Sequence, residues 1–528
     1  MTALAERPAA HLPSGITGAV GVLLAWELAA RALDGTYLLA GPVSVAAYLM
    51  ENAGLVSRAL AVTFESAALG FVIGNLVAIA LALMALLVPR AERLVAAVAL
   101  FVSCLPFVAT GPILRVIGGP GTAPQITLAA LAVYYVTFLT LMVGLRASPS
   151  AWLDLVRSYG RNRWTEIVQV RARASLPYLI AGLQITAPAA FLGAMVGEFT
   201  GAERGMGVLA IRAMRGLDVT ATWALATVAS ATAILVYAGI GWIGRRLNAA
   251  PPPIILSAPP PETRSSALGS VGSWLLLGAV ATCAILLLWA GLMELFGLNE
   301  FFAKRPWHVF DFLVTASDAA DHRAALFSAL LETMYSAAPG YLLGLLLGAG
   351  LAVIVVSLPA LASTVLPTAI ALRSIPIITT APLIVLALGR GSVGTITIVA
   401  IMIFFPTLVA CVEGMRQAPA PVIDLFRTYS ASRWTSLRLA RIPAMLPAFF
   451  ASARIAVPAA ILAATVAEWL ATGTGIGSLM AISASTSAYA MLWSSIVVVA
   501  ALSAASYGLV SLVERRVLTV YASEQLSR

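Results

Sequence analysis

The second half of this chain repeats the first half at a fixed offset of 270 residues. The register does not slip between residues 63 and 246, and it matches tryptophan, proline, glycine and charged positions that alanine-rich sequence would not pair by accident. The matched pairs include Thr63 with Thr333, Gly70 with Gly340, Pro106 with Pro376, Trp164 with Trp434, Pro188 with Pro458, Glu198 with Glu468, Trp223 with Trp493 and Arg245 with Arg515. The chain therefore consists of two copies of one unit, and its function requires both.

The composition is that of a membrane protein. Hydrophobic residues make up 60% of the 528 residues and charged residues 10%, whereas soluble domains carry about 25% charged residues. The net charge of +9 does not indicate nucleic-acid binding, because the charges are sparse and lie between apolar segments. Cys104, Cys283 and Cys411 fall inside apolar segments, so the sequence predicts neither a disulfide framework nor a metal site.

Apolar segments recur along the whole chain, and each is long enough to cross a bilayer, which takes about 20 residues per helix. Six lie in each half, so both halves enter the membrane from the same side and are related by an axis along the membrane normal. The sequence therefore predicts an all-α polytopic membrane protein with about 12 transmembrane helices in two parallel six-helix repeats. The expected spans lie near 16–33, 61–88, 92–115, 125–146, 177–200, 222–243, 271–296, 331–357, 361–387, 393–414, 447–470 and 490–512. We read the first of them as a retained helix, because no small-residue cleavage site follows it closely.

Arginine placement predicts the orientation of these spans. The segments 146–173 and 416–441 carry clusters of arginine, and two more arginines follow the second span. Because positively charged loops stay in the cytoplasm, we place these segments and both chain ends there. Residues 247–270 are rich in proline, which favours a semi-rigid extended tether. The expected domains are a first repeat over 1–246, this linker over 247–270 and a second repeat over 271–528.

The two arginine-rich segments share a motif, which is the strongest local signal in the sequence. Each copy predicts a short amphipathic helix, a sharp turn and a second short helix, after which a proline opens the next span. Taken alone, each is equally consistent with a solvated basic loop whose tryptophan lies at the membrane interface. The first copy contains Asp154, Tyr159, Gly160, Arg163, Trp164 and Pro177, and the second contains Asp424, Tyr429, Ser430, Arg433, Trp434, Pro443 and Pro447.

The motif resembles the "EAA" loop of permeases in binding-protein-dependent ABC importers. In that loop an acidic residue precedes a glycine by six positions and a Leu-Pro follows; Asp154 and Asp424 stand at the acidic position and Gly160 at the glycine. The segments 432–434 and 467–477, with the paired prolines between them, resemble the nitrate/sulfonate/taurine class of these permeases. The resemblance covers nearly all of both halves, and it implies a type I importer permease whose two loops dock cytoplasmic ATPase subunits.

The resemblance also implies the wider assembly. It implies a two-copy permease fused into one chain in a bacterial cytoplasmic membrane, with two ABC ATPase subunits and one periplasmic or lipid-anchored solute-binding protein as partners. The transported solute would be a small anion or heterocycle. The match has departures: both acidic positions are Asp rather than Glu, Ser430 stands opposite Gly160, Arg173 opposite Pro443, and Gln184 opposite Arg454. The first copy therefore departs further from the family pattern than the second.

No nucleotide-binding motif accompanies these loops. A P-loop requires a lysine followed by serine or threonine, whereas Lys304, the single lysine, is followed by Arg305. We therefore expect ATP and Mg to be bound by a partner subunit, with no cofactor and no enzymatic chemistry in this chain. The principal alternative is a secondary transporter with parallel six-helix repeats, but the loops after the second span of each half lack the Gly-x-x-x-Asp-Arg/Lys pattern usual there. A membrane scaffold without transport activity is a weaker alternative.

Prolines in the third span of each half are candidates for the transport pathway. Pro106 and Pro112 recur as Pro376 and Pro382, six residues apart in both copies. Each frees a backbone carbonyl and bends its helix, so the bent spans would either line a central pathway or pack as ordinary kinks.

Three charged residues within apolar spans are further candidates. Glu198 and Glu468 end the fifth span of each half, directly before glycine-rich segments that offer free N–H groups. We favour a structural tie or an outer gate for them over contact with substrate. Arg454 lies about two turns into its span, where it would attract an anion or extend to the cytoplasmic headgroups.

Overall fold

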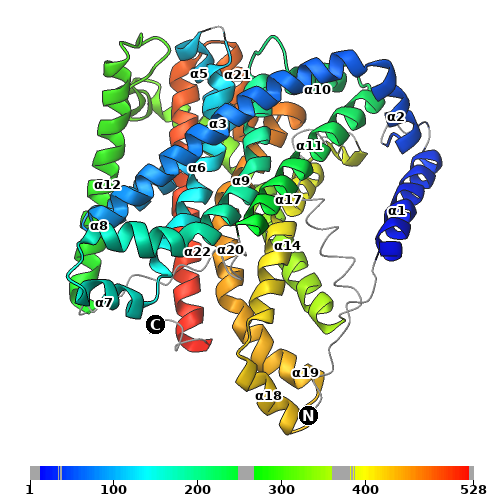
Figure 1. Cartoon of the computed structure of the whole chain (residues 1–528). Helices are drawn as coiled ribbons and strands as arrows, with labels where there is room; N and C mark the ends of the chain where they lie inside the picture. Colours follow the sequence, from blue (N-terminus) through cyan, green and yellow to red (C-terminus); the bar gives the residue numbers. More distant parts are fainter. Residues whose placement is uncertain are drawn as a thin grey trace.

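The structure is a computed structural model in which residues 12–33, 35, 39–119, 121–247, 267–358, 381, 384–385, 387–389 and 391–521 are described. In this part of the chain the only regular secondary structure is helical (Figure 1). Residues 248–266 of the linker expected at 247–270 lie outside the described residues, as do Pro376 and Pro382.

The helices follow one another in the same order in both repeats. The first repeat contains α1 (Leu12–Ala32), α2 (Pro42–Glu51), α3 (Ala53–Leu87), α4 (Glu92–Ser103), α5 (Phe107–Gly118), α6 (Ala123–Arg146), α7 (Ser150–Ser158), α8 (Arg163–Thr165), η1 (Glu166–Arg171), α9 (Ala172–Phe199), α10 (Met206–Arg215) and α11 (Val219–Arg246). The second contains α12 (Ala267–Leu295), α13 (Pro306–Phe310), η2 (Asp311–Thr315), α14 (Ala319–Ser357), α17 (Ser392–Arg416), α18 (Ala420–Thr428), α19 (Arg433–Ser436), η3 (Leu437–Arg441), α20 (Ile442–Ala467), η4 (Glu468–Thr472), α21 (Gly475–Ser485) and α22 (Tyr489–Tyr521).

Nine helices among the described residues are long and apolar enough to cross a membrane. They coincide with nine of the twelve expected spans, although several extend well beyond the predicted ends; α14, for example, has 39 residues. Of the remaining three, the span near 16–33 corresponds to α1, which is not among these nine, and the span near 361–387 falls mostly on residues outside the description. The all-α polytopic prediction is therefore confirmed.

The span predicted near 92–115 is not one bent helix. The chain instead forms two 12-residue helices, α4 and α5, which are interrupted between Ser103 and Phe107. The physical reason is Pro106, which disfavours a helical conformation at the residue before it and itself takes an extended conformation at the start of α5. Pro112, by contrast, lies inside α5. Each helix is about 18 Å long, too short to cross the bilayer alone.

Glycines bring the long helices of each repeat close together. A Cβ atom added at Gly74 of α3 would lie 2.6 Å from the carbonyl oxygen of Ala130 in α6. In the second repeat, a Cβ added at Gly344 of α14 would lie 2.7 Å from the carbonyl of Ala400 in α17. Such close backbone contact is how helices associate in lipid, where no hydrophobic effect drives them together. The repeat in sequence is therefore also a repeat in packing.

Helices of one repeat pack directly against helices of the other. Helix α12 of the second repeat packs against α4 of the first, and α5 packs among α20, α21 and α22 (Figure 1). In the latter contact, Ala109 and Ile113 of α5 belong to a buried cluster that includes Val457, Ile476 and Leu492. Neither repeat therefore encloses all of its own apolar surface.

The repeat continues beyond the constant register. Trp26 of α1 packs against Trp223, with ring centroids 5.8 Å apart, and Trp289 of α12 stacks on Trp493 at 5.2 Å. Since Trp223 and Trp493 are matched positions, Trp26 and Trp289 are equivalent at an offset of 263. The second repeat therefore has seven additional residues between its first span and Thr333, and this shift hid the equivalence of the first spans in the sequence.

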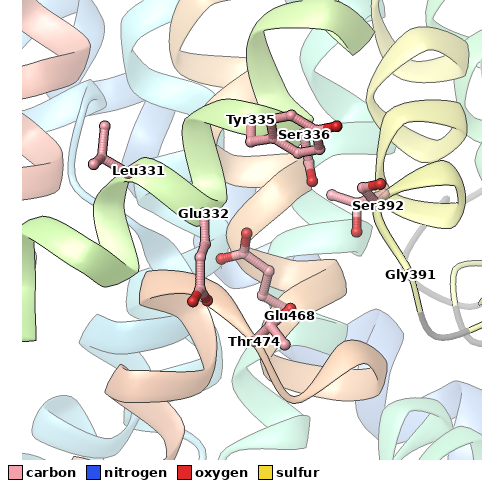
Figure 2. A pocket seen from close by; sticks show the side chains of 9 residues that line it. Leu331, Glu332, Tyr335, Ser336, Gly391, Ser392, Glu468 and Thr474 are labelled. Carbon is pink, nitrogen blue, oxygen red and sulfur yellow. The ribbon is translucent and has the colours of Figure 1, made fainter.

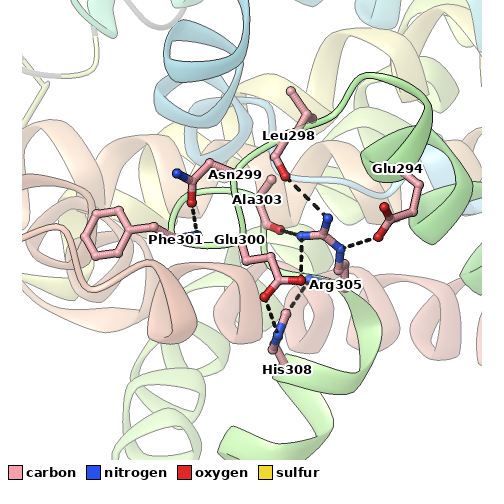
Figure 3. Close-up of polar contacts among 8 residues, drawn as sticks. All are labelled: Glu294, Leu298, Asn299, Glu300, Phe301, Ala303, Arg305 and His308. Atoms are coloured by element: carbon pink, nitrogen blue, oxygen red, sulfur yellow. Dashed lines mark hydrogen bonds and ion pairs between the residues drawn. The ribbon is translucent and has the colours of Figure 1, made fainter.

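A buried arginine fixes the connection between α12 and α13, as Figure 3 shows. The Nε atom of Arg305 lies 2.8 Å from Glu294, and its other nitrogens contact Glu300 at 3.6 Å and the carbonyl of Leu298 at 3.4 Å. The hydrogen bond to Glu294 raises the pKa of Arg305. These contacts hold the loop in a defined conformation at the end of the bundle remote from α7 and α18.

Candidate docking loops and membrane clasps

The two loop motifs adopt the same backbone conformation at one end of the bundle (Figure 1). In the first, α7 ends at a turn in which Gly160 has φ 63°, and the side chain of Asn162 then caps α8 by accepting the N–H of Thr165. In the second, α18 ends at a turn in which Ser430 has φ 53°, and Ser432 caps α19. The turn thus requires a left-handed residue, which glycine adopts without strain and serine at some cost. The predicted helix–turn–helix is confirmed in both copies.

Both loops expose the same aromatic side chains. Tyr159 is 76% exposed and Tyr429 is 78% exposed, and Trp164 and Trp434 are similarly exposed. Large exposed aromatic rings next to arginines are typical of contact sites for another protein. The matched exposure means that each loop presents a similar apolar surface. The two surfaces differ at one position, where Trp152 in α7 is replaced by the smaller Val422 in α18.

The second short helix of each motif is not separate from the following span. A π-helical segment, η1 or η3, joins α8 to α9 and α19 to α20. Pro177 and Pro447 therefore do not open the next span as predicted, because they lie inside α9 and α20, whereas Pro443 lies in the first turn of α20. A π-helical turn leaves room for such irregularity within a continuous helix. The second short helix of each loop is consequently continuous with a membrane helix.

At the opposite end of α9, Glu198 forms the centre of a hydrogen-bonded arrangement that we call the first clasp, made by Thr63, Glu198, Met206 and Gly207. The hydroxyl of Thr63 donates to Oε1 of Glu198 over 2.6 Å, and the N–H of Gly207 donates to Oε2 over 2.6 Å. The N–H of Met206 in turn donates to the Thr63 hydroxyl over 2.8 Å. The buried carboxylate therefore joins α3, α9 and the beginning of α10.

The second clasp, made by Thr333, Glu468, Ile476 and Gly477, repeats these contacts. Thr333 donates to Oε2 of Glu468 over 2.8 Å, Gly477 donates to the same oxygen over 3.0 Å, and Ile476 donates to Thr333 over 2.9 Å. One contact has no equivalent in the first repeat: Glu332 accepts the N–H of Gly475 over 2.8 Å, whereas Val62 stands at the matched position. Figure 2 shows Glu332 and Glu468 beside a cavity of about 370 Å³.

A glycine at the start of each clasp is required by the carboxylate. Gly205 has φ 133° and Gly475 has φ 79°, and a Cβ atom at either position would overlap the carboxyl group of Glu198 or Glu468. The sequence identified both glutamates and the glycine-rich segments. It did not identify Thr63 and Thr333 as their partners, because each threonine lies 135 residues away along the chain.

Arg454 forms an ion pair within the protein. Its Nε atom lies 3.0 Å from Oε2 of Glu514 in α22, and its guanidinium lies over the ring of Tyr507. In the first repeat both charges are absent: Gln184 stands opposite Arg454, Gly244 stands opposite Glu514, and Gln184 donates to the carbonyl of Tyr237 instead. The paired replacement leaves each repeat without an unbalanced charge at this site.

Pro106 lies beside a cavity of about 250 Å³ between the repeats. Its wall includes Tyr135 from α6 of the first repeat and Met402, Pro458 and Tyr507 from the second. Of the two prolines in this span, Pro112 is not part of the described wall. The sequence did not identify these two tyrosines, because it does not show that α6 and α22 contribute to the same cavity.

Comparison with known proteins identifies the family. The family model described as "Binding-protein-dependent transport system inner membrane component" matches residues 70–249 and again residues 340–519. The chain belongs to this family. Its two matches confirm a fused two-domain ABC transporter permease, a transport protein rather than an enzyme, and a multi-pass membrane protein. No solved structure matches this chain.

Individual relatives of this permease align over part of its length. A "Probable ABC transporter permease protein" of Haemophilus influenzae is 29% identical over 229 residues, which are 43% of this chain and 94% of the relative. The "Formylaminopyrimidine transport permease protein ThiX" of Halalkalibacterium halodurans is 24% identical over 42% of this chain and 88% of its own length. A "Putative aliphatic sulfonates transport permease protein SsuC" of Bacillus subtilis is 26% identical over 37% of this chain and 70% of its own length.

Proposed function

We propose that one copy of this chain forms the whole membrane permease of an ATP-driven importer. The observation that carries the proposal is the duplicated loop, which exposes the same tyrosine and tryptophan twice at one end of a single bundle. Related permeases match about one half of this chain while covering most of their own length, so two such units are present here. A second copy of the chain is then unnecessary.

The loops dock two cytoplasmic ATPase subunits in this proposal. The exposed rings of Tyr159, Trp164, Tyr429 and Trp434 supply the apolar contact, and the neighbouring arginines supply polar contact. ATP and Mg are bound by those subunits. The arginine-rich ends of the spans support a cytoplasmic location for the loops and for both chain termini, because positively charged loops stay in the cytoplasm.

The clasps then lie toward the outer face, where a solute-binding protein delivers its cargo. We propose that Glu198 and Glu468 tie the outer ends of the pathway rather than contact the solute, because their hydrogen bonds are made to the protein itself. The solute is a small anion or a heterocycle. This class is supported by relatives named for formylaminopyrimidine and for aliphatic sulfonates.

Native mass spectrometry of the purified complex tests the proposal. We expect one permease chain with two ATPase subunits, and one binding protein when solute is present. A complex with two permease chains per two ATPase subunits would contradict it.

A further inference from the structure

One position in the docking loops differs in a way that changes what the loop can offer a partner. In the first loop, Arg157 of α7 is held by Glu166, with Nε 2.8 Å from Oε1 and Nη2 3.4 Å from Oε2. The Glu166 side chain is only 9% exposed, so this ion pair fixes α7 against η1. The hydrogen bond that Arg157 donates to Glu166 also raises the pKa of Arg157. The guanidinium group of Arg157 is therefore occupied by a contact within its own loop.

The second loop lacks this tie. Ser436 occupies the position of Glu166, and the matched Arg427 makes a single ionic contact within the described part of the chain, 3.3 Å from Asp424. Arg427 is 75% exposed, and Asp424 belongs to the same helix. Exposed pairs of this kind contribute little free energy, so a partner's carboxylate can replace Asp424 without a large cost.

In the first loop, a different arginine is exposed and can contact a partner. Arg161 follows the Gly160 turn and is exposed, whereas the matched residue in the second loop is Ala431. No ion pair of Arg161 is present among the described residues. The guanidinium group that a partner can engage thus lies after the turn in the first loop, at Arg161, and before the turn in the second, at Arg427 with its exposed pair to Asp424. Arg163 and Arg433, which follow both turns, do not distinguish the loops.

We infer that the two loops bind the ATPase through different ion pairs, one made by Arg161 and the other by Arg427, each with an acidic side chain of the ATPase. The inference rests on the proposed docking function. The exposed tyrosine before each turn and the tryptophan after it are common to both loops, and the inference concerns the placement of charge around them. A single acidic group on the ATPase surface cannot serve both loops in the same register, and the two interfaces are therefore unequal.

Site-specific cross-linking of the full chain tests this inference. Benzoylphenylalanine in place of Tyr159 or Tyr429 reports contact at each loop separately, with the ATPase that co-purifies with the chain. In the Tyr429 reporter we expect Ser436→Glu, which ties Arg427 as Glu166 ties Arg157, to lower cross-linking by about tenfold, as expected for loss of an interfacial charge pair. In the Tyr159 reporter, Arg161→Ala should have an effect of similar size.

The controls separate charge from structure. Ser436→Gln adds a side chain of similar size without charge and should leave cross-linking at Tyr429 unchanged, while Ser436→Glu should leave cross-linking at Tyr159 unchanged. Equal yields for Ser436→Glu and Ser436→Gln, together with no effect of Arg161→Ala, would overturn the inference. If neither reporter cross-links to an ATPase in the absence of other changes, the docking function itself is contradicted.

Discussion

Thr63 and Glu198, 135 residues apart, are joined by a hydrogen bond of 2.6 Å, and Thr333 and Glu468 are joined at the same separation over 2.8 Å. Each threonine hydroxyl donates to the carboxylate and accepts a backbone N–H from the next helix. The hydroxyl thus satisfies two buried groups at once. Its removal takes the acceptor from the N–H of Met206 or Ile476 and leaves the carboxylate with the hydrogen bond from Gly207 or Gly477.

We expect Thr63→Val, which keeps the side-chain shape and removes the hydroxyl, to destabilise the protein by about 1–3 kcal/mol, the usual cost of unsatisfied buried groups. Thr333→Val should act similarly, because its contacts are the same. Thermal unfolding of the detergent-solubilised chain measures the effect, with Thr63→Ser as the control that retains the hydroxyl. Equal melting temperatures for Thr63→Val and Thr63→Ser would show that the hydroxyl contributes nothing.

Gly205→Ala and Gly475→Ala should both weaken the fold, because the added methyl group overlaps a clasp carboxylate and the backbone has positive φ. We expect a loss of about 1–3 kcal/mol, comparable with overpacking in a core. Gly239→Ala is the matched control, since its added Cβ meets no atom within 4 Å in the middle of α11. The measurement is the same melting experiment, and a drop for Gly239→Ala as large as for Gly205→Ala would remove the steric explanation.

Arg454→Gln leaves the buried Glu514 without its ion-pair partner, so we expect destabilisation of a few kcal/mol. Adding Glu514→Gln to the same chain should recover much of this loss, because the remaining charge is removed, as in the first repeat. Urea or thermal unfolding of the two single variants and the double variant forms a complete cycle. Additive losses would mean that the two side chains do not interact energetically.

Asp154→Arg and Asp424→Arg should each abolish stimulation of ATP hydrolysis by loaded binding protein, if both loops must engage together. Membrane insertion and stability should be unchanged, because both aspartates are exposed and their pairs with Arg157 and Arg427 lie on a single helix. The assay is ATPase activity of the complex in reconstituted vesicles. Normal stimulation in both variants would show that the aspartates are ordinary loop charges.

The sequence predicted most of the architecture because the repeat provides each signal twice. Nine of the expected spans and the turn after each docking helix agree with the structure, and Ser430 takes the left-handed conformation that its match with Gly160 required. The interruption at Pro106 was underestimated as a bend, because hydropathy remains high across the break, whereas Pro106 itself takes an extended conformation.

The contacts that the site residues make could not be predicted as well from the sequence. Thr63, Glu514 and Tyr507 carry no local pattern that links them to Glu198 or Arg454, since the contacts depend on which helices pack together. Pro177 and Pro447 were misplaced because proline at a helix start and proline inside a membrane helix look alike in sequence.

The location of the clasps has a consequence for biosynthesis. Each clasp joins residues of a single repeat, so its partners are all synthesised once α10 or α21 has left the ribosome. The first repeat can therefore close its clasp while the second is still being translated, since domains fold in order during synthesis. By contrast, α5 gains its neighbours α20, α21 and α22 only after nearly the whole chain exists. Closure within the first repeat can thus precede the assembly of the two halves.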